Sequence, residues 1–307
     1  IMKERRKRNM SRTGLLFMFC LLMLCGCAQI TGFMENTEVS GREVESLAAE
    51  KEDDTVLLGG MPVGIYMETD GVLVLDTEKM TGMDGKEYTP AQGVVSSGDY
   101  ITEVNHQKIE GKKQLMDLVE HLDGEKVLLT VRRENTILEK KLTPVQISKG
   151  NYRLGIWVRD NVQGLGTITF LTKNNRFAAL GHGIHDIDTS TLLTIKRGTL
   201  YRTSIQKVQK GSKGNPGTME GIIVYNRFHR LGVIEKNTDA GIYGELNSDR
   251  SWIGEEVPIQ VAKKEEIKTG EARIRCYIDG EVKEYTICIT QIDKESDQVN
   301  KGMIIQV

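Results

Sequence analysis

The stretch with the clearest chemical potential is FAALGHGIHDIDT, residues 177–189, where two histidines and two aspartates follow an apolar run. His182 stands between two glycines, which permit a sharp turn and leave the imidazole accessible. Three roles are open to it: a metal ligand, a catalytic base, or a histidine that only ends a buried strand with its ring bonded to a backbone carbonyl. As a base it could take a proton from a serine and return it to a leaving amine, because imidazole titrates near neutral pH.

The metal role is the weakest of the three. His182, His185 and either Asp186 or Asp188 are close in the sequence, and His229 could join them only if the fold brought it near. An HxxH pair without a helix and without a clear third ligand is not a zinc signature. We therefore expect no metal and no other cofactor.

Length and composition bound the class of protein. A chain of 307 residues has room for about two domains of ordinary size. Its 41 Lys and Arg residues nearly balance 43 Asp and Glu residues, so no basic field indicates nucleic acid as a partner. The abundance of glycine (32) over proline (5) favours a turn-rich β protein.

The first 30 residues predict export. The basic run KERRKRNMSR precedes the apolar stretch GLLFMFCLLMLCGCAQI, which ends in small residues, as a signal peptide or membrane anchor does. Cleavage after Ala28, lipidation of Cys27 and an uncleaved anchor are all open. All three alternatives place the rest of the chain outside the cytoplasmic membrane. The two anchored alternatives also keep it attached to that membrane. Residues 31–54 are polar and without a period, which predicts a linker.

Two cysteines lie in the body of the chain. Cys276 and Cys288 flank the turn signal Asp279-Gly280, so they could face each other across a hairpin. A disulfide bridge and two free thiols are both open.

Residues 55–147 are predicted to form an α+β domain. Strand-like stretches surround KKQLMDLVEHLDG, in which Leu115, Leu118, Val119 and Leu122 share one helical face and Gly124 is placed to end the helix. This succession, above all SGDYITEVN at 97–105, resembles a bacterial-type PDZ domain.

The PDZ resemblance implies binding of a peptide by strand addition. The residues in the place of the loop that holds the peptide carboxylate are Gly60, Met61, Pro62, Val63, Gly64 and Ile65. Pro62 departs from the pattern because it removes one amide donor. Docking within the chain, without a free peptide, is equally open.

Residues 148–307 show an all-β pattern of short strand-like stretches separated by Gly, Asp and Asn, which favours a barrel or sandwich. The whole chain is therefore expected to be mainly β.

The order of an export signal, a PDZ-like domain and AALGHGIHDIDT resembles the SpoIVB (stage IV sporulation protein B) serine peptidase family. Residues 211–217 (GSKGNPG), 239–244 (DAGIYG) and 301–307 (KGMIIQV) support the resemblance. It implies a chymotrypsin-like all-β peptidase domain over 148–307, with His182 as the general base.

For function, the resemblance implies an exported serine endopeptidase of sporulation signalling, in the space between the forespore and mother-cell membranes. Such a peptidase cleaves itself and a regulator of a membrane-embedded metalloprotease, which leads to activation of a sporulation transcription factor. Its partners are thus a protein substrate, the protein itself in autoproteolysis and the membrane, with no nucleic acid.

The catalytic partners of His182 are where this chain departs from the family. The family's aspartate and serine, the latter in a GMSGSP loop, follow the strand that reads KGMIIQV here, so we expect both beyond Val307 and a C-terminally incomplete domain. No serine of this chain has the G-x-S-G setting that builds an oxyanion hole. The six considered are Ser190, Ser204, Ser212, Ser248, Ser251 and Ser296.

Asp186 and Asp188 are expected to stabilise a turn rather than to complete a triad. The chain as given is therefore expected to be inactive. The alternative function is a catalytically dead, PDZ-type protein-binding module at the membrane.

Overall fold

The computed structural model describes residues 55–307, apart from 213, 248, 255, 279 and 297–300. The predicted signal segment (1–30) and linker (31–54) lie outside the described residues. The chain divides into two units, 1–43 and 44–307, and everything described here belongs to the second. Within the described part, no helix combines the length and apolar character that a membrane span requires.

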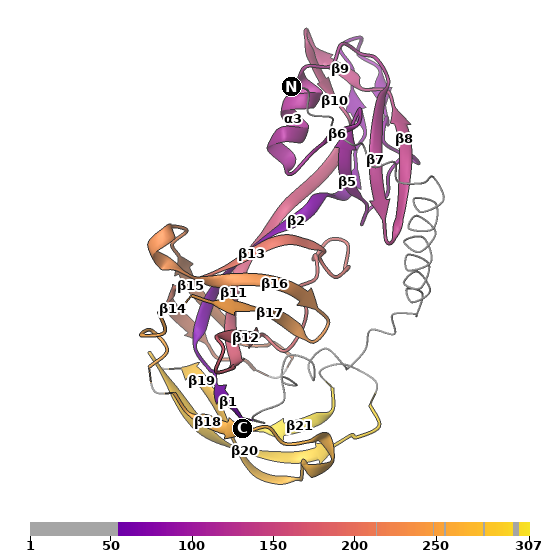
Figure 1. Ribbon diagram of the computed structural model, residues 1–307. Coiled ribbons are helices and arrows are strands. Elements are labelled where there is room, and N and C mark those ends of the chain that lie inside the picture. Colours follow the sequence, from indigo (N-terminus) through magenta and orange to yellow (C-terminus); the bar gives the residue numbers. More distant parts are fainter. Residues whose placement is uncertain (1–54, 213, 248, 255, 279, 297–300) are drawn as a thin grey trace, which may run out of the picture. The chain divides into compact units, whose positions relative to one another are not determined.

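The described residues are mainly β, which confirms the expected fold class. They form twenty-one strands, one α-helix and two short 3-10 helices. Figure 1 labels these elements along the chain.

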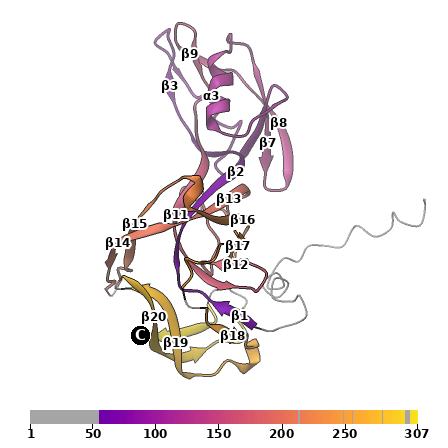
Figure 2. The same cartoon turned by 60° about the vertical axis from the view of Figure 1, so that its left-hand side comes forward.

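Two long antiparallel strands organise this part of the chain. β2 (Pro62–Thr77) and β11 (Ile156–Leu171) pair from Pro62↔Thr167 to Thr77↔Ile156, with β-bulges between. Figures 1 and 2 show them side by side over their length. β2 contributes buried side chains to two separate clusters, which we call the first core and the second core. β11 contributes buried side chains to the second core and partly buried ones to the first.

The first core gathers fourteen buried hydrophobic residues, among them Val72 and Val74 of β2, Ile101, Leu115 and Leu129. The elements around it are β3 (Met80–Thr81), β4 (Glu87–Tyr88), β5 (Tyr100–Val104), β6 (Gln107–Lys108), α3 (Lys112–Glu120), β7 (Val127–Arg133), β8 (Thr136–Leu142), β9 (Val145–Ser148) and β10 (Asn151–Arg153).

Helix α3 follows from its amphipathic pattern. It buries Leu115 and Val119, and Leu118 and Leu122 pack against the same core, as predicted. The predicted end at Gly124 was wrong, because the helix ends at Glu120 with His121 as its C-cap.

Asp99 of the SGDYITEVN stretch is buried and fixes the start of β5. The Arg133 guanidinium donates to both of its carboxylate oxygens, at 2.7 and 2.9 Å, and Ser96 N–H donates to Oδ2 at 2.8 Å. This two-point ion pair holds the turn before β5 to the end of β7. The motif therefore has a structural role in this chain.

The second core fills a closed ring of six strands. β12 (Arg176–Ala179), β13 (Ile195–Tyr201), β16 (Arg230–Thr238) and β17 (Gly241–Leu246) complete the ring with β2 and β11, in the order β11-β12-β17-β16-β13-β2. The pairing of β2 with β11 closes it. Val63, Ile65 and Met67 alternate inward along β2, as the two-residue period of a strand dictates. A closed ring leaves none of its strands at an edge.

The remaining elements surround the ring. They are β1 (Thr55–Leu58), β14 (Thr203–Gln209), β15 (Thr218–Ile223), η1 (Arg227–His229), β18 (Pro258–Gln260), η2 (Lys264–Glu266), β19 (Gly270–Ile278), β20 (Glu281–Ile292) and β21 (Met303–Gln306). β19, β20 and β21 form a separate three-stranded sheet.

The predicted domain limits, 55–147 and 148–307, stay a prediction. The two cores divide the chain differently: residues 57–67 pack in the second core with residues from 168 onward, whereas Leu154 packs in the first. The segment that builds the first core is thus inserted between two parts of the ring.

Of the two states left open for Cys276 and Cys288, the structure has the unbridged one, because both thiols are free. In the β19–β20 hairpin Cys276 pairs with Lys283 and Cys288 with Glu271, so the two lie at different rungs. Asp279 of the turn lies outside the described residues.

Candidate active site

His182 lies in the loop of residues 180–194, which leaves the ring after β12 and returns to it at β13. The loop begins with two positive φ angles, +76° at Leu180 and +88° at Gly181. These turn the chain away from the strand and place His182 at the surface. The turn expected from the Gly-His-Gly pattern is therefore present.

The imidazole of His182 is held in one tautomer. Its Nδ1 lies 2.9 Å from the carbonyl oxygen of Gly183. A carbonyl can only accept, so Nδ1 carries a proton, and in the neutral ring Nε2 keeps its lone pair. This is the bond to a backbone carbonyl that a strand-ending histidine would make, and it also leaves the nitrogen that a general base needs free to accept a proton.

Gly183 has no space for a side chain. A Cβ there would lie 2.5 Å from Leu192 Cδ1 and 2.5 Å from the carbonyl oxygen of Thr238. The close approach allows Gly183 N–H to donate to Asp239 O at 3.0 Å. Glycine at this position therefore lets the loop lie against the turn between β16 and β17.

Asn237, at the end of β16, joins the two arms of the loop. Its Oδ1 accepts from Ile184 N–H at 2.9 Å, and its Nδ2 donates to the carbonyls of Ile184 at 2.9 Å and Leu193 at 3.0 Å. Leu193 N–H also donates to Ile184 O at 3.1 Å. One side chain thus fixes Ile184, two positions after His182, and Leu193, where the loop returns toward β13.

Asp186 and Asp188 stabilise the tip of the loop. Asp186 is buried, and its Oδ1 accepts from the N–H groups of Asp188 (3.0 Å) and Thr189 (2.9 Å). Arg159 of β11 ion-pairs with both carboxylates. The aspartates act in the turn, as expected, and Arg159 is a partner that the sequence did not indicate.

His185 is exposed and has weaker contacts. Its Nδ1 lies 3.3 Å from the same Gly183 carbonyl, and its Nε2 lies 3.7 Å from Asp239 Oδ1. Among residues 55–307 with the gaps given above, no three His, Cys, Asp or Glu side chains gather closely enough to hold a metal ion. His229 instead bonds to Asn226 Oδ1 through Nδ1, at 2.8 Å.

Comparison with known proteins decides the family. The model of the family described as SpoIVB peptidase S55 matches residues 150–307, half of the chain, including the ring strands from β11 onward and the His182 loop. The chain belongs to the SpoIVB peptidase family.

A second match is to a protein of Helicobacter pylori (strain J99) named "Putative zinc metalloprotease", with 28% identity over 180 residues. The match covers 51% of this chain and 50% of that protein, so the chain spans about half the length of the curated relative. Among solved structures, the PDZ domain of an SdrC-like protein from Listeria monocytogenes is similar at 24% identity and a TM-score of 0.23. That match covers 29% of this chain and 87% of the other.

Four of the six candidate serines bond within their own turns and strands. Ser190 N–H donates to Asp186 O at 2.8 Å, and Ser212 N–H to Asn215 O at 2.8 Å. Ser204 Oγ accepts from Gln206 at 2.9 Å, and Ser251 N–H donates to Asp249 at 3.0 Å, which with the Ser251 hydroxyl lowers the pKa of that aspartate. Ser248 lies outside the described residues, and Ser296 bonds elsewhere.

The six residues expected to hold a peptide carboxylate do not form an open loop. Met61, Val63 and Ile65 are buried in the second core, and Gly60 N–H donates to Ile168 O at 2.7 Å. From Gly64 onward this part of β2 is paired with β11 on one side and β13 on the other. Peptide binding by Gly60–Ile65 stays a prediction, and the occupied edges count against it, because an added strand must displace one of them.

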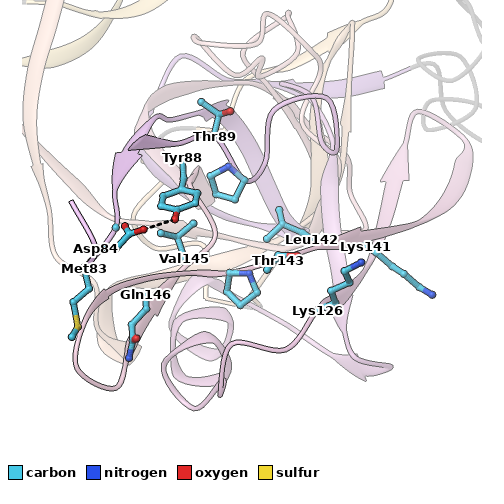
Figure 3. Close-up of a pocket in the computed structure, with 13 residues that line it drawn as sticks. Met83, Asp84, Tyr88, Thr89, Lys126, Lys141, Leu142, Thr143, Val145 and Gln146 are labelled. Atoms are coloured by element: carbon cyan, nitrogen blue, oxygen red, sulfur yellow. Dashed lines mark hydrogen bonds between the residues drawn. The ribbon is translucent and has the colours of Figure 1, made fainter. Parts of the chain in front are cut away.

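A pocket of about 670 Å³ opens beside the first core. Figure 3 shows Tyr88 pointing at Asp84 across it, with Lys126 and Lys141 on the wall. The Tyr88 hydroxyl donates to Asp84 at 2.8 Å, which raises the pKa of Tyr88. Lys86 N–H and that hydroxyl together lower the pKa of Asp84. The lining residues come from 82–90, 126 and 141–146, and none belongs to the His182 loop.

Proposed function

We propose that the protein is a serine endopeptidase in which His182 is the general base. Membership of the SpoIVB peptidase family supports peptidase activity. The observation that carries the role of His182 is the contact of its Nδ1 with the Gly183 carbonyl, because an exposed neutral ring with Nδ1–H bonded there keeps Nε2 available for a proton. The loop contacts through Asn237 support it further, since a base must be held still.

In the proposed reaction, His182 Nε2 takes the proton from a serine Oγ while that oxygen attacks the scissile carbonyl. The imidazolium then gives the proton to the leaving amine, and the acyl-enzyme forms. Water, deprotonated by the same imidazole, hydrolyses the acyl-enzyme. From the family resemblance we expect the serine and the aspartate beyond Val307, so the protein to assay is the one encoded by the whole gene.

We further propose that this peptidase is exported to the space between the forespore and mother-cell membranes and is held at the membrane by its N-terminal segment. Its substrates there would be the protein itself, in autoproteolysis, and a regulator of a membrane-embedded metalloprotease. The basic and apolar run in residues 3–30 supports export, and the family resemblance supports the substrates.

The test compares the wild-type gene product with His182→Ala and His185→Ala. Self-cleavage is followed by mass spectrometry and general activity with fluorescein-labelled casein. We expect His182→Ala to lose at least about a thousandfold in rate and His185→Ala, in the same loop, to stay near wild type. A wild-type protein without cleavage, or a fully active His182→Ala variant, contradicts the proposal. The former result would favour the protein-binding alternative.

A further inference from the structure

We propose that Arg159 is a positioning residue for His182. It ties the His182 loop to β11 through two aspartates, and the proposal rests on the function proposed above for that histidine.

The Arg159 guanidinium bridges two carboxylates. Nη1 contacts Asp186 Oδ2, and Nη2 lies 2.9 Å from Asp188 Oδ2. Asp186 is fully buried, whereas the side chain of Asp188 is half exposed. Without the guanidinium, two carboxylates would face each other in one turn, one of them out of water, so the positive charge is needed for the turn to keep this arrangement.

Asp186 determines the shape of the turn that Arg159 holds. Besides the two N–H groups that its side chain accepts, its backbone N–H donates to Thr191 O at 2.9 Å and its carbonyl accepts from Ser190 N–H at 2.8 Å. The residues between Asp186 and His182 are fixed in turn, because Ile184 is bonded to Asn237. The three residues between Asp186 and His182 form a short, constrained connection, so the position of Asp186 bears on the position of the imidazole.

Arg159 lies where β11 passes from one core to the other. It pairs with Leu73 of β2, next to a bulge between Arg159 and Asn161. Val158 packs against the first core and Val162 against the second. The guanidinium thus fixes the loop to the part of the strand pair that both cores hold rigid.

A second contact anchors the return of the loop to the same region. Leu193 is buried with Leu73 and Tyr100 in a small cluster of its own, and Thr194 N–H donates to the Tyr100 hydroxyl at 3.1 Å. With Arg159, the loop is held at its tip and at its return by β2, β5 and β11. This arrangement leaves the segment around His182 short and constrained, which is what a base needs for a reproducible approach to its substrate.

The experiment uses the whole gene product and four variants: Arg159→Gln, Arg159→Lys, Arg176→Gln and His182→Ala. Arg176 is the matched control, because its side chain is as exposed as that of Arg159 and bridges Glu235 and Glu245, away from the loop. Rates are measured with a quenched fluorescent peptide that spans the self-cleavage site found by mass spectrometry.

We expect Arg159→Gln to lower kcat roughly 10- to 100-fold with KM within about twofold, because binding is kept while the base is misplaced. Arg159→Lys should recover part of kcat, since one ammonium can pair with one carboxylate but cannot match the fork of the guanidinium. Arg176→Gln should be indistinguishable from wild type. A merely structural role would not produce this division between kcat and KM.

The proposal is overturned if Arg159→Gln matches Arg176→Gln while His182→Ala is inactive; the function proposed for His182 would then survive. Activity in His182→Ala, or none in the wild type, would instead contradict that function. If Arg159→Gln does not fold, Asp188→Asn decides, because it keeps the buried pair and removes only the half-exposed carboxylate. It should lower kcat several-fold with KM unchanged, and an unchanged kcat overturns the proposal.

Discussion

The Asn237 side chain makes two hydrogen bonds to the backbone of Ile184. Its Oδ1 accepts from the N–H of Ile184 and its Nδ2 donates to the carbonyl of the same residue, each at 2.9 Å. The two residues are 53 positions apart in the sequence. These hydrogen bonds fix the backbone two residues after His182. The geometry of the loop therefore depends on strand β16, which carries no candidate catalytic residue.

Asn237→Ala should lower both stability and activity. It leaves Ile184 N–H, Ile184 O and Leu193 O without this partner, and we expect the free energy of unfolding to fall by about 2 kcal/mol. Asn247→Ala is the control, since Asn247 donates one side-chain bond, to Arg230 O, at an exposed site. Urea denaturation of both variants measures the difference in stability. Equal losses would contradict a special contribution of the Asn237 hydrogen bonds.

Gly183→Ala should distort the loop. The added methyl would meet the Thr238 carbonyl and Leu192 Cδ1 at 2.5 Å. We therefore expect the free energy of unfolding to fall by about 1–3 kcal/mol and peptidase activity to be lost. Gly164→Ala on β11, where nothing lies within 4 Å of the new Cβ, should cost less than about 1 kcal/mol. Thermal unfolding checks both, and a Gly183→Ala protein as stable as Gly164→Ala would contradict the packing described here.

Asp99→Asn should weaken the first core. The carboxylate is buried under a bidentate bond from Arg133, whose side chain is partly exposed, so the expected cost is about 2 kcal/mol, below that of a fully buried pair. Lys79→Ala breaks the exposed Lys79–Glu87 pair and should change stability by less than about 0.5 kcal/mol. The comparison fails if the two variants unfold at the same urea concentration.

The two cysteines should react at different rates and remain unbridged. Burial raises the pKa of the Cys276 thiol from its ordinary value of 9.0, whereas Cys288 is exposed. Because the folded pKa is the higher one, the contribution of this thiol to stability is complete below pH 9.0 and is lost as the pH rises through the folded pKa. At pH 8, iodoacetamide should therefore modify Cys288 first, as read by peptide mapping without a reductant. A Cys276–Cys288 disulfide peptide would contradict the pairing register.

The sequence supports predictions that depend on local pattern. The β-rich fold, the face of α3 and the turn around His182 all follow from periodicity and glycine placement, which act over a few residues. What escapes is long-range pairing. Asp70-Gly71 is typical of a turn, yet Gly71, with φ +92°, lies inside the single strand β2, which pairs with β13 up to Thr69 and with β5 from Val72. The same holds for Arg159, which reaches its aspartate across 27 positions.

The loop expected at Gly60–Ile65 shows the same limit from another side. Its glycines and Pro62 fit a turn when read locally, but Val63 and Ile65 complete the inward pattern of the ring. Burial of these apolar side chains outweighs the local preference for a loop. Only the partner strands, which lie some 100 positions further along the chain, reveal that role.

The claim that His182 activates a serine is tested most directly by fluorophosphonate labelling of the whole gene product. The reagent reacts covalently with a serine whose hydroxyl is activated by a base, and mass spectrometry locates the adduct. If His182 is the base, we expect one labelled serine in the wild type, in a G-x-S-G setting beyond Val307. Labelling should be at least about a hundredfold slower in His182→Ala and near the wild-type rate in His185→Ala. Equal labelling of wild type and His182→Ala would contradict it.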